Sequence, residues 1–329
     1  MATIREIAFM AGVSSTTVSR VLNYDETISV NDDTRARIFN IAKELGYSKK
    51  IINPLIENVA FLYWIENEEK LEDEYFKAIY DEIKEQARAR NIKLKVYYRR
   101  DGINAIEEGT SAFLAIGWFD RKELDYLRSK IKTGVFIDSS PDEKYFDAVR
   151  PNLDSMVTQI VDYFILKGHR SIGFFGGHDK NIDTGDKVMD VREWSFRESM
   201  KYYGFLCENY IFLSDEFTVK DGYKTAKRAI AEYGENLPTA FCIASDTLAI
   251  GILQAFNEAN IAIPARVAFY SINNISIVRY VSPPLTTFHI DVPLLCESAI
   301  DLLAERILKD RDITKTVFIN GSPFFRKSC

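Results

Sequence analysis

The sequence predicts an α/β protein in which a small helical domain precedes a larger domain built from two parallel-sheet lobes. Its first 48 residues carry three stretches of helical periodicity and no strand pattern. From residue 58 onward, short apolar runs alternate with helical patterns, which is typical of parallel sheets covered by helices. A single sheet of that many strands would be unwieldy, so we expect two similar lobes.

The stretch from Thr3 to Asn23 has the pattern of a helix-turn-helix. Apolar residues recur at three- and four-residue spacing in two short segments, which predicts two helices that each bury one face. Between the helices, Gly12 can take the positive φ of a tight turn, and Val13 fills the corner. Ser14 can cap the second helix, because its hydroxyl can accept a hydrogen bond from an unpaired backbone N–H.

Short hydroxyl side chains and one arginine are left on the outward face of the second helix. Such a face suits the DNA major groove, where Ser and Thr contact phosphates or base edges and Arg binds phosphate or guanine. From spacing alone, a helical hairpin that merely packs on another part of the protein is the alternative. The outward residues are Ser15, Thr16, Thr17, Ser19 and Arg20.

A third helix is expected to close this domain. It can begin at Asp32 or Asp33, either of which could cap it, and it has an apolar stripe from Ile38 to Leu45. Gly46 is a natural end for such a helix, so the helical domain should end near residue 48.

The N-terminal residues resemble the DNA-binding headpiece of the LacI/GalR family of bacterial transcription regulators. The matching segments are Thr3-Ile4, Ala11-Gly12-Val13-Ser14 and the run from Thr17 to Asn23. The resemblance implies a headpiece over residues 1–48 that binds operator double-stranded DNA, with a homodimer reading two half-sites. The residues expected at the DNA are Thr3, Ser14, Ser15, Thr16, Thr17, Arg20 and Asn23.

Residues 49–57 form the expected linker. In the family, the corresponding segment commonly folds on DNA into a short hinge helix whose leucines wedge into the minor groove. Here the usual alanine–arginine pattern is missing and the segment is several residues short, so a plain tether is an equal alternative. Leu55 and Ile56 are the candidate wedges.

The resemblance covers essentially the whole chain and implies two effector subdomains of the periplasmic sugar-binding type. We expect the N-terminal subdomain at 58–152 and 288–311, and the C-terminal subdomain at 153–287 and 312–329. The expected strands are 59–65, 94–98, 112–117, 134–137, 171–175, 210–213, 240–244 and 267–272, and the expected helices are 75–89, 122–129, 152–167, 191–203, 221–233, 247–260 and 291–308.

Candidate effector residues follow strands, because ligands of open parallel sheets lie beyond the carboxyl ends of the strands. Asp138 matches a polar effector contact of the family and could accept hydrogen bonds from sugar hydroxyls, or it is a turn residue. The resemblance implies that Arg192 grips effector oxygens, although Ser195 replaces the family's glycine nearby. It also implies that Phe217 stacks on the effector ring. A surface charge and a core phenylalanine are the respective alternatives.

Four further residues complete the expected effector site. By resemblance, Ser245 takes a ligand-facing place while Asp246 mainly caps the following helix. Asn273 stands where the family usually has an aspartate, so this site is less anionic than usual. Trp64 and Tyr75 end a strand and begin a helix, so they could wall the cleft, with core packing as the alternative.

Two segments look most like galactose and β-galactoside operon regulators of Gram-positive bacteria, namely Val21 to Thr27 and Leu71 to Tyr75. We therefore expect a repressor of a sugar-utilisation operon that is controlled by a small, galactose-type sugar effector. The alternative is a catabolite-type regulator that is controlled by a protein corepressor or a sugar phosphate.

Other protein classes find little support. The sequence has no GxSxG, Walker A or HExxH motif, so we expect no enzyme, no catalytic residues and no cofactor. Four scattered cysteines and three histidines offer no metal-ligand spacing, and the cysteines indicate reduced thiols in a cytoplasmic protein. We expect no membrane partner, because no apolar run reaches about 18 residues.

The charge distribution fits an acidic body on a mildly basic DNA-binding end. The formal net charge of −6 argues weakly against nucleic-acid binding. Residues 1–24, however, hold two arginines and one glutamate, a balance of 2 − 1 = +1. The C-terminal residues show no heptad pattern, so a tetramer built by the tail is not expected.

Overall fold

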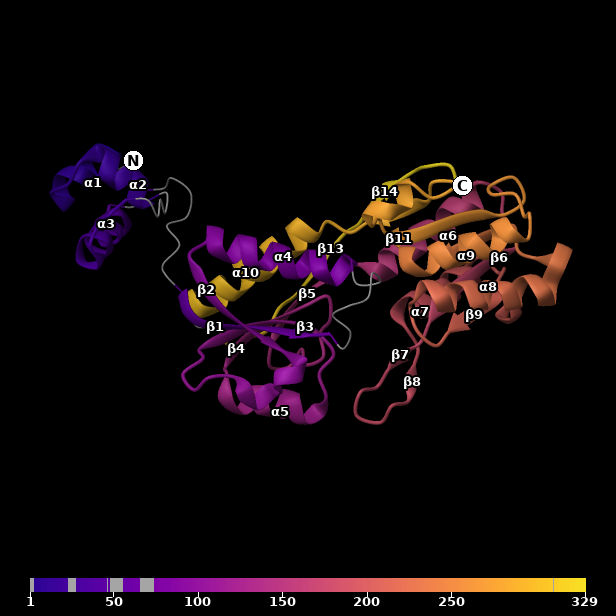
Figure 1. The fold of residues 1–329 in the computed structure, drawn as a ribbon, viewed down its shortest axis with the longest axis horizontal. Coiled ribbons are helices and arrows are strands. Elements are labelled where there is room, and N and C mark those ends of the chain that lie inside the picture. Colours follow the sequence, from indigo (N-terminus) through magenta and orange to yellow (C-terminus); the bar gives the residue numbers. More distant parts are fainter. Residues whose placement is uncertain (1–2, 23–27, 46, 48–55, 66–73, 310) are drawn as a thin grey trace. The chain divides into compact units, whose positions relative to one another are not determined.

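The computed structural model describes residues 3–22, 28–45, 47, 56–65, 74–309 and 311–329 (Figure 1). The chain forms two compact units. One unit comprises Met1–Val59 with Lys84–Lys95, and the other comprises Ala60–Ile83 with Val96–Cys329.

The headpiece is a three-helix domain, as the sequence predicts. Its core is formed by small and branched apolar side chains from all three helices. Gly12 ends the first helix in the left-handed conformation at φ 67°, and its N–H points back to the carbonyls of Ala8 and Phe9. Asn31, and not Asp32 or Asp33, caps the third helix, because its Oδ1 accepts from the Thr34 N–H at 2.8 Å. The helices are α1 (Ile4–Ala11), α2 (Ser15–Leu22) and α3 (Asp32–Glu44).

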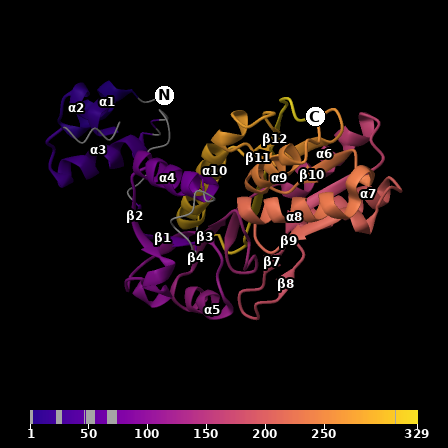
Figure 2. The ribbon, with the colours of Figure 1, turned by 45° about the vertical axis from the view of Figure 1, so that its right-hand side comes forward.

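The first lobe holds a six-stranded sheet with the order β13-β5-β4-β3-β1-β2. Helices α4 and α10 lie on one face of this sheet and α5 lies on the other (Figures 1 and 2). Its elements are β1 (Ile56–Trp64), α4 (Glu74–Ala89), β2 (Ile92–Tyr98), β3 (Ala112–Gly117), α5 (Arg121–Lys130), β4 (Thr133–Ile137), β5 (Asp147–Pro151), α10 (Val292–Lys309) and β13 (Thr316–Ile319).

The second lobe repeats the plan with the strand order β14-β12-β11-β10-β6-β9. Its strands pair in parallel except for β14, which runs antiparallel to β12. Its elements are α6 (Leu153–Leu166), β6 (Ile172–Gly177), α7 (Val191–Tyr202), β9 (Ile211–Ser214), α8 (Val219–Tyr233), β10 (Ala240–Ile243), α9 (Asp246–Glu258), β11 (Ala268–Asn273), β12 (Thr286–His289) and β14 (Ser322–Phe324).

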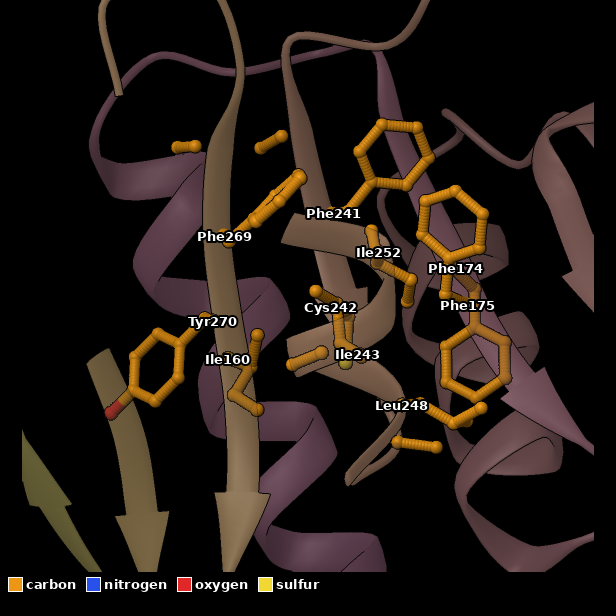
Figure 3. Packing of buried hydrophobic residues seen from close by; sticks show 14 of the residues in the cluster. Ile160, Phe174, Phe175, Phe241, Cys242, Ile243, Leu248, Ile252, Phe269 and Tyr270 are labelled. Atoms are coloured by element: carbon orange, nitrogen blue, oxygen red, sulfur yellow. The ribbon is translucent and has the colours of Figure 1, made fainter. Parts of the chain in front are cut away.

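Aromatic side chains fill the core of the second lobe (Figure 3). The rings of Phe175 and Phe241 lie 4.5 Å apart between centroids, and Phe241 also meets Phe269 at 6.2 Å. Such ring pairs stabilise the core beyond the burial of their area. The strands of the second lobe that precede the candidate effector residues are therefore packed against a dense aromatic core.

Two shorter kinds of element complete the fold. A two-stranded hairpin, β7 (Asp179–Lys180) and β8 (Lys187–Val188), projects from the second lobe between β6 and α7 (Figure 2). Single 3₁₀ turns occur at Arg99–Asp101, Ile103–Ala105, Glu208–Tyr210, Gly234–Asn236 and Ser276–Arg279.

The structure corrects three predicted boundaries. Phe288 and His289 lie in β12, which pairs with β11 of the second lobe, so they do not belong to the N-terminal subdomain as predicted. The chain leaves the first lobe after β13, which pairs with β5, so residues 312–319 do not belong to the C-terminal subdomain as predicted. The predicted linker at 49–57 overlaps β1, which already begins at Ile56. The sequence also gave no expectation of β5, β12, β13, β14 or the β7–β8 hairpin. Among the described residues, no helix is both long and apolar enough to cross a membrane.

Candidate DNA-binding face and effector site

The start of α2 presents short hydroxyl side chains to solvent. Ser14 caps the helix as predicted, because its Oγ accepts from the Thr17 N–H at 2.9 Å. The Thr17 hydroxyl lies 2.8 Å from the same oxygen and is therefore partly committed to the cap. Ser15 and Thr16 are exposed, and Arg20 is half-buried near the end of the helix. Ser15 and Thr16 are therefore the most accessible candidate DNA-binding side chains of α2.

Thr3 has a structural role that the sequence prediction did not assign. Its Oγ1 accepts from the Glu6 N–H at 3.3 Å, and the Glu6 carboxylate accepts from the Thr3 N–H at 2.7 Å. This reciprocal pair is a capping box for α1, and the Thr3 side chain remains exposed. Asn23, the last predicted DNA contact of the headpiece, lies outside the described residues.

The structure contradicts one of the two predicted hinge wedges. Ile56 is only 7% exposed and lies in β1. Its N–H donates to the Asn91 carbonyl at 3.3 Å. A side chain packed in a strand cannot reach a DNA groove, so Ile56 is removed from the DNA contacts. Leu55 lies outside the described residues.

Arg192 is the most constrained residue of the candidate effector site. Its Nε and Nη2 donate to the two oxygens of Asp190, each at 2.7 Å, and its Nη1 donates to the Ala244 carbonyl at 2.9 Å. A guanidinium has five N–H donors, so these three bonds leave 5 − 3 = 2 for another partner. The Arg192 side chain is 14% exposed.

The ion pair changes both pKa values. Burial would raise the pKa of Asp190, but the charge and hydrogen bonds of Arg192 outweigh burial and hold that pKa below its usual value. Burial likewise opposes the charge on Arg192, yet Asp190 raises the pKa of the guanidinium above its ordinary range. Both groups are therefore charged throughout the physiological range. Asp190 also caps α7 by accepting from the Arg192 N–H at 2.7 Å.

Phe217 lies directly beneath this guanidinium. The Arg192 carbon Cζ stands 4.5 Å from the centroid of the Phe217 ring, which is a cation–π arrangement. A Cβ on Gly177, at the end of β6, would come within 3.0 Å of the same ring. The structure thus places Phe217 against Arg192, and one face of its ring is occupied by the guanidinium.

Two residues of the first lobe form the other half of the site. Asp138 follows β4 with φ at 72°, and its Oδ1 accepts from the Tyr75 hydroxyl at 2.6 Å. Burial raises the pKa of Asp138, and the hydrogen bond from Tyr75 and the charge on Arg192 offset part of that rise. Burial, followed by the charge on Asp138, raises the pKa of Tyr75, so Tyr75 stays a neutral donor. The electrostatic interaction of Asp138 with Arg192 joins the two halves of the site.

Arg150 belongs to this cluster, although the sequence analysis did not single it out. Ile137 pairs with Val149, so Asp138 and Arg150 follow at the same level on neighbouring strands. Arg150 Nη1 donates to Ser140 Oγ at 2.9 Å, and its charge lowers the pKa of Asp138. Among the described residues, its buried Nε has no hydrogen-bond partner, and the same holds for the Ser139 hydroxyl. These buried polar atoms suit a ligand that brings its own donors and acceptors.

The hairpin contributes a third carboxylate. Desolvation and then the negative charge of Asp190 raise the pKa of Asp179 in β7, although the residue as a whole is exposed. The positive charge of Arg192 lowers the pKa of Asp179, so Asp179 interacts electrostatically with the same cluster of charged groups.

The structure gives the cap of α9 to Ser245 and not, as predicted, to Asp246. Ser245 is buried and caps α9, because its Oγ accepts from the Leu248 N–H at 3.3 Å. Asp246 is fully buried and accepts from the Thr287 hydroxyl at 2.8 Å and from the Ile275 N–H at 2.9 Å. Burial raises the pKa of Asp246 to about 6 despite these donors. The capping bond of Ser245 thus makes it a structural residue.

The structure also contradicts the prediction that Trp64 walls the effector cleft. Its side chain is 0% exposed, its Nε1 donates to Glu123 at 2.7 Å, and its ring stacks on Phe119 with 5.3 Å between centroids. Trp64 is therefore part of the core of the first lobe and does not wall a cleft.

Asn273 ends β11 at the carboxyl edge of the second sheet. It is half-buried and has φ at 119°, a conformation that is rare for a residue with a side chain. The neighbouring Asn274 accepts from Arg326 Nη2 at 2.6 Å, which holds that second amide against the C-terminal segment. Asn273 stays a predicted effector residue.

The headpiece and the body each match a known family. Residues 3–50 match the family described as bacterial regulatory proteins, lacI family, and residues 161–329 match a periplasmic binding protein-like domain. The chain is 49% identical over 328 residues to the HTH-type transcriptional regulator GanR of Bacillus subtilis (strain 168), covering 100% of this chain and 99% of the relative. It is 36% identical over 334 residues to the regulator LacR of Lactobacillus helveticus, covering 100% and 98%. It is 31% identical over 331 residues to GalR of Lacticaseibacillus casei, covering 100% and 99%.

Solved structures agree with this assignment at the level of the fold. A transcriptional regulator CelR–cellobiose complex has a TM-score of 0.70 and 20% identity, and the match covers 100% of both chains. A LacI family regulator CCPA from Weissella paramesenteroides with bound sucrose has a TM-score of 0.67 and 20% identity, covering 82% of this chain and 97% of that chain. The chain belongs to the LacI family of bacterial transcription regulators, which act as dimers on operator DNA.

Proposed function

We propose that this protein represses a sugar-utilisation operon in the cytoplasm and that a neutral, galactose-type sugar controls it. The relatives named GanR, LacR and GalR support a galactose-type effector. We assign effector binding to Arg192, Phe217, Asp138 and Tyr75. The observation that carries the assignment is the fixed Arg192 guanidinium, which has two donors left and interacts electrostatically with Asp138.

The charge of the cluster favours a neutral sugar over a sugar phosphate. Three carboxylates, Asp138, Asp190 and the exposed Asp179, interact with two guanidiniums, Arg150 and Arg192, which gives 2 − 3 = −1 when all are ionised. A phosphate would add a charge of about −1.5 to −2 to this site. The cation best placed to meet it, Arg192, is already paired bidentately with Asp190.

The headpiece supplies the DNA-binding half of the proposed function. The exposed Ser15 and Thr16 at the start of α2 are placed to contact base edges or phosphates, and Arg20 would bind phosphate or guanine. We propose that DNA binding and effector binding are separate activities of the two domains, and that the protein has no catalytic role. The sugar would then act by favouring one of two arrangements of the protein.

Thermal melting of the purified full-length protein tests the proposal. A ligand that binds only the folded state raises the melting temperature by mass action. Galactose or a β-galactoside should raise it, glucose 6-phosphate should not, and the rise should vanish in Arg192→Ala. Arg170→Ala is the matched control, because Arg170 binds backbone carbonyls on the same lobe but has no contact with the cluster. A shift with the sugar phosphate alone would overturn the proposal.

A further inference from the structure

A strip of three aromatic rings continues outward from the effector residues. Tyr75, which donates to Asp138, meets Phe76 with 5.3 Å between ring centroids. Phe76 in turn meets Trp118 at 5.6 Å. Trp118 is 42% exposed. The strip therefore begins at a part-buried polar contact and ends at an accessible indole.

The sheet places the outer end of the strip next to the effector site. Ile116 of β3 pairs with Ile137 of β4, so Gly117 and Asp138 follow at the same level on neighbouring strands. Trp118 is the next residue, and it lies at the carboxyl edge where open parallel sheets bind ligands. Gly117 is needed there, because its φ is 105° and a Cβ would lie 2.2 Å from the Trp64 carbonyl oxygen.

Two residues that lie close to the strip in sequence make hydrogen bonds between the lobes. Glu74, next to Tyr75, accepts from the Ser276 N–H of the second lobe at 3.3 Å. Close to Trp118, the Arg121 N–H at the start of α5 donates to Asp183 of the hairpin loop at 2.8 Å. The aromatic strip therefore follows the line along which the two lobes meet.

We infer that Phe76 and Trp118 form a subsite for a second sugar ring, so the effector is a disaccharide or a longer neutral saccharide. This inference rests on the proposed function. The first ring binds at Asp138, Tyr75 and Arg192, and the second ring stacks its apolar face on Trp118. Aromatic faces suit sugar rings, because the axial C–H groups of a pyranose are apolar while its hydroxyls stay in water. The three linked rings are longer than a single pyranose can cover.

Binding measurements on the full-length protein test the subsite. Calorimetric titration would compare galactose with lactose, a β-1,4-linked disaccharide that contains galactose. Trp118→Ala should weaken lactose binding by roughly two- to tenfold, in line with the stabilisation by an aromatic contact, and leave galactose binding unchanged. Trp118→Phe should retain most of the lactose affinity. Trp194→Ala is the matched control, because Trp194 is 55% exposed on α7.

Fluorescence quenching gives a second readout that does not depend on affinity. The chain has three tryptophans, and Trp64 is fully buried, so Trp118 is the accessible one in the Trp194→Phe variant. Lactose should protect Trp118 from acrylamide, whereas galactose should not.

The possible results separate the two proposals. Equal losses for both sugars in Trp118→Ala, or no loss for either, would overturn the second subsite and leave the proposed function intact. Tight binding of galactose with no binding of lactose would do the same. If the wild-type protein binds neither these sugars nor any related neutral saccharide, both proposals fail.

Discussion

The Arg192–Asp190 pair should show strong energetic coupling, because each charge is buried against the other. The two side chains are 14% and 6% exposed and share two hydrogen bonds of 2.7 Å. Removing one partner of a buried pair leaves an uncompensated charge and costs about 3–5 kcal/mol. Because the Arg192 side chain keeps 14% of its surface exposed, we expect the lower end, about 3 kcal/mol, for Arg192→Ala.

Asp190→Ala should cost slightly more. This substitution leaves the Arg192 guanidinium without its carboxylate partner, and it also removes the N-cap of α7, which contributes about 1 kcal/mol. The double variant leaves no unpaired charge, so its loss should be about 2 kcal/mol, far below the sum of the single losses.

Urea denaturation followed by circular dichroism measures these free energies. The four proteins of the cycle are the wild type, the two single variants and the double variant. Arg170→Ala, which removes an exposed arginine that bonds backbone carbonyls of the same lobe, should cost only about 1 kcal/mol, well below either single loss. Additive losses in the double variant would refute the conclusion that the two charges depend on each other.

Three further predictions test other parts of the structure. Thr16→Ala and Arg20→Ala should each weaken operator binding by roughly tenfold, which is the effect of losing one base or phosphate contact. Neither variant should change the sugar-induced shift in melting temperature. Equal loss of DNA binding and sugar binding would argue against separate sites. Gly117→Ala should destabilise the first lobe by more than about 1 kcal/mol in thermal melting. The reason is that the backbone of Gly117 has a positive φ and that an added Cβ would clash with the Trp64 carbonyl. An unchanged melting temperature would show that the ends of β1 and β3 can move apart to admit the Cβ. The pKa of Asp246 is raised to about 6 in the folded state, so the folded protein takes up a proton that the unfolded chain binds only near pH 4. Relative to Asp246→Asn, the wild type should therefore gain stability as the pH falls from 7 to 4, and parallel pH profiles of the two proteins would contradict this sign.

The headpiece could be predicted because its determinants are local. The turn at Gly12, the cap at Ser14 and the apolar spacing of two adjacent helices all lie within one short stretch of sequence. The third helix shows the limit of such reasoning. Asn31, Asp32 and Asp33 are all good capping residues, and only the backbone conformation decides that Asn31 makes the bond.

Strand β5 and its arginine could not be predicted, because the strand depends on distant partners. Its five residues include Asp147, Arg150 and a proline, which hide the apolar signal of a buried strand. Asp147 is fully buried because Arg306 and Arg311, far along the chain, both pair with its carboxylate. Without β5, the position of Arg150 beside Asp138 at the carboxyl edge of the sheet remains hidden.

The capping of α9 by Ser245 and not by Asp246 has the same origin. Both residue types are favourable caps, so the sequence around α9 does not distinguish them. The Thr287 hydroxyl and the Ile275 N–H come from β12 and from the loop after β11, and together they hold Asp246 in the interior. Once Asp246 turns inward, Ser245 is left to cap the helix.

The proposed effector site would offer a physical route from sugar binding to DNA binding. Arg192 is held by Asp190 and Ala244 within the second lobe, so this half of the site is formed before any ligand arrives. Asp138 belongs to the first lobe, and a sugar that bonds to both residues stabilises the arrangement in which they are close. An arrangement that the sugar does not bridge gains nothing from it, and this difference in affinity is what shifts the population. If operator DNA prefers a different arrangement of the lobes, each ligand must weaken the binding of the other by the same factor.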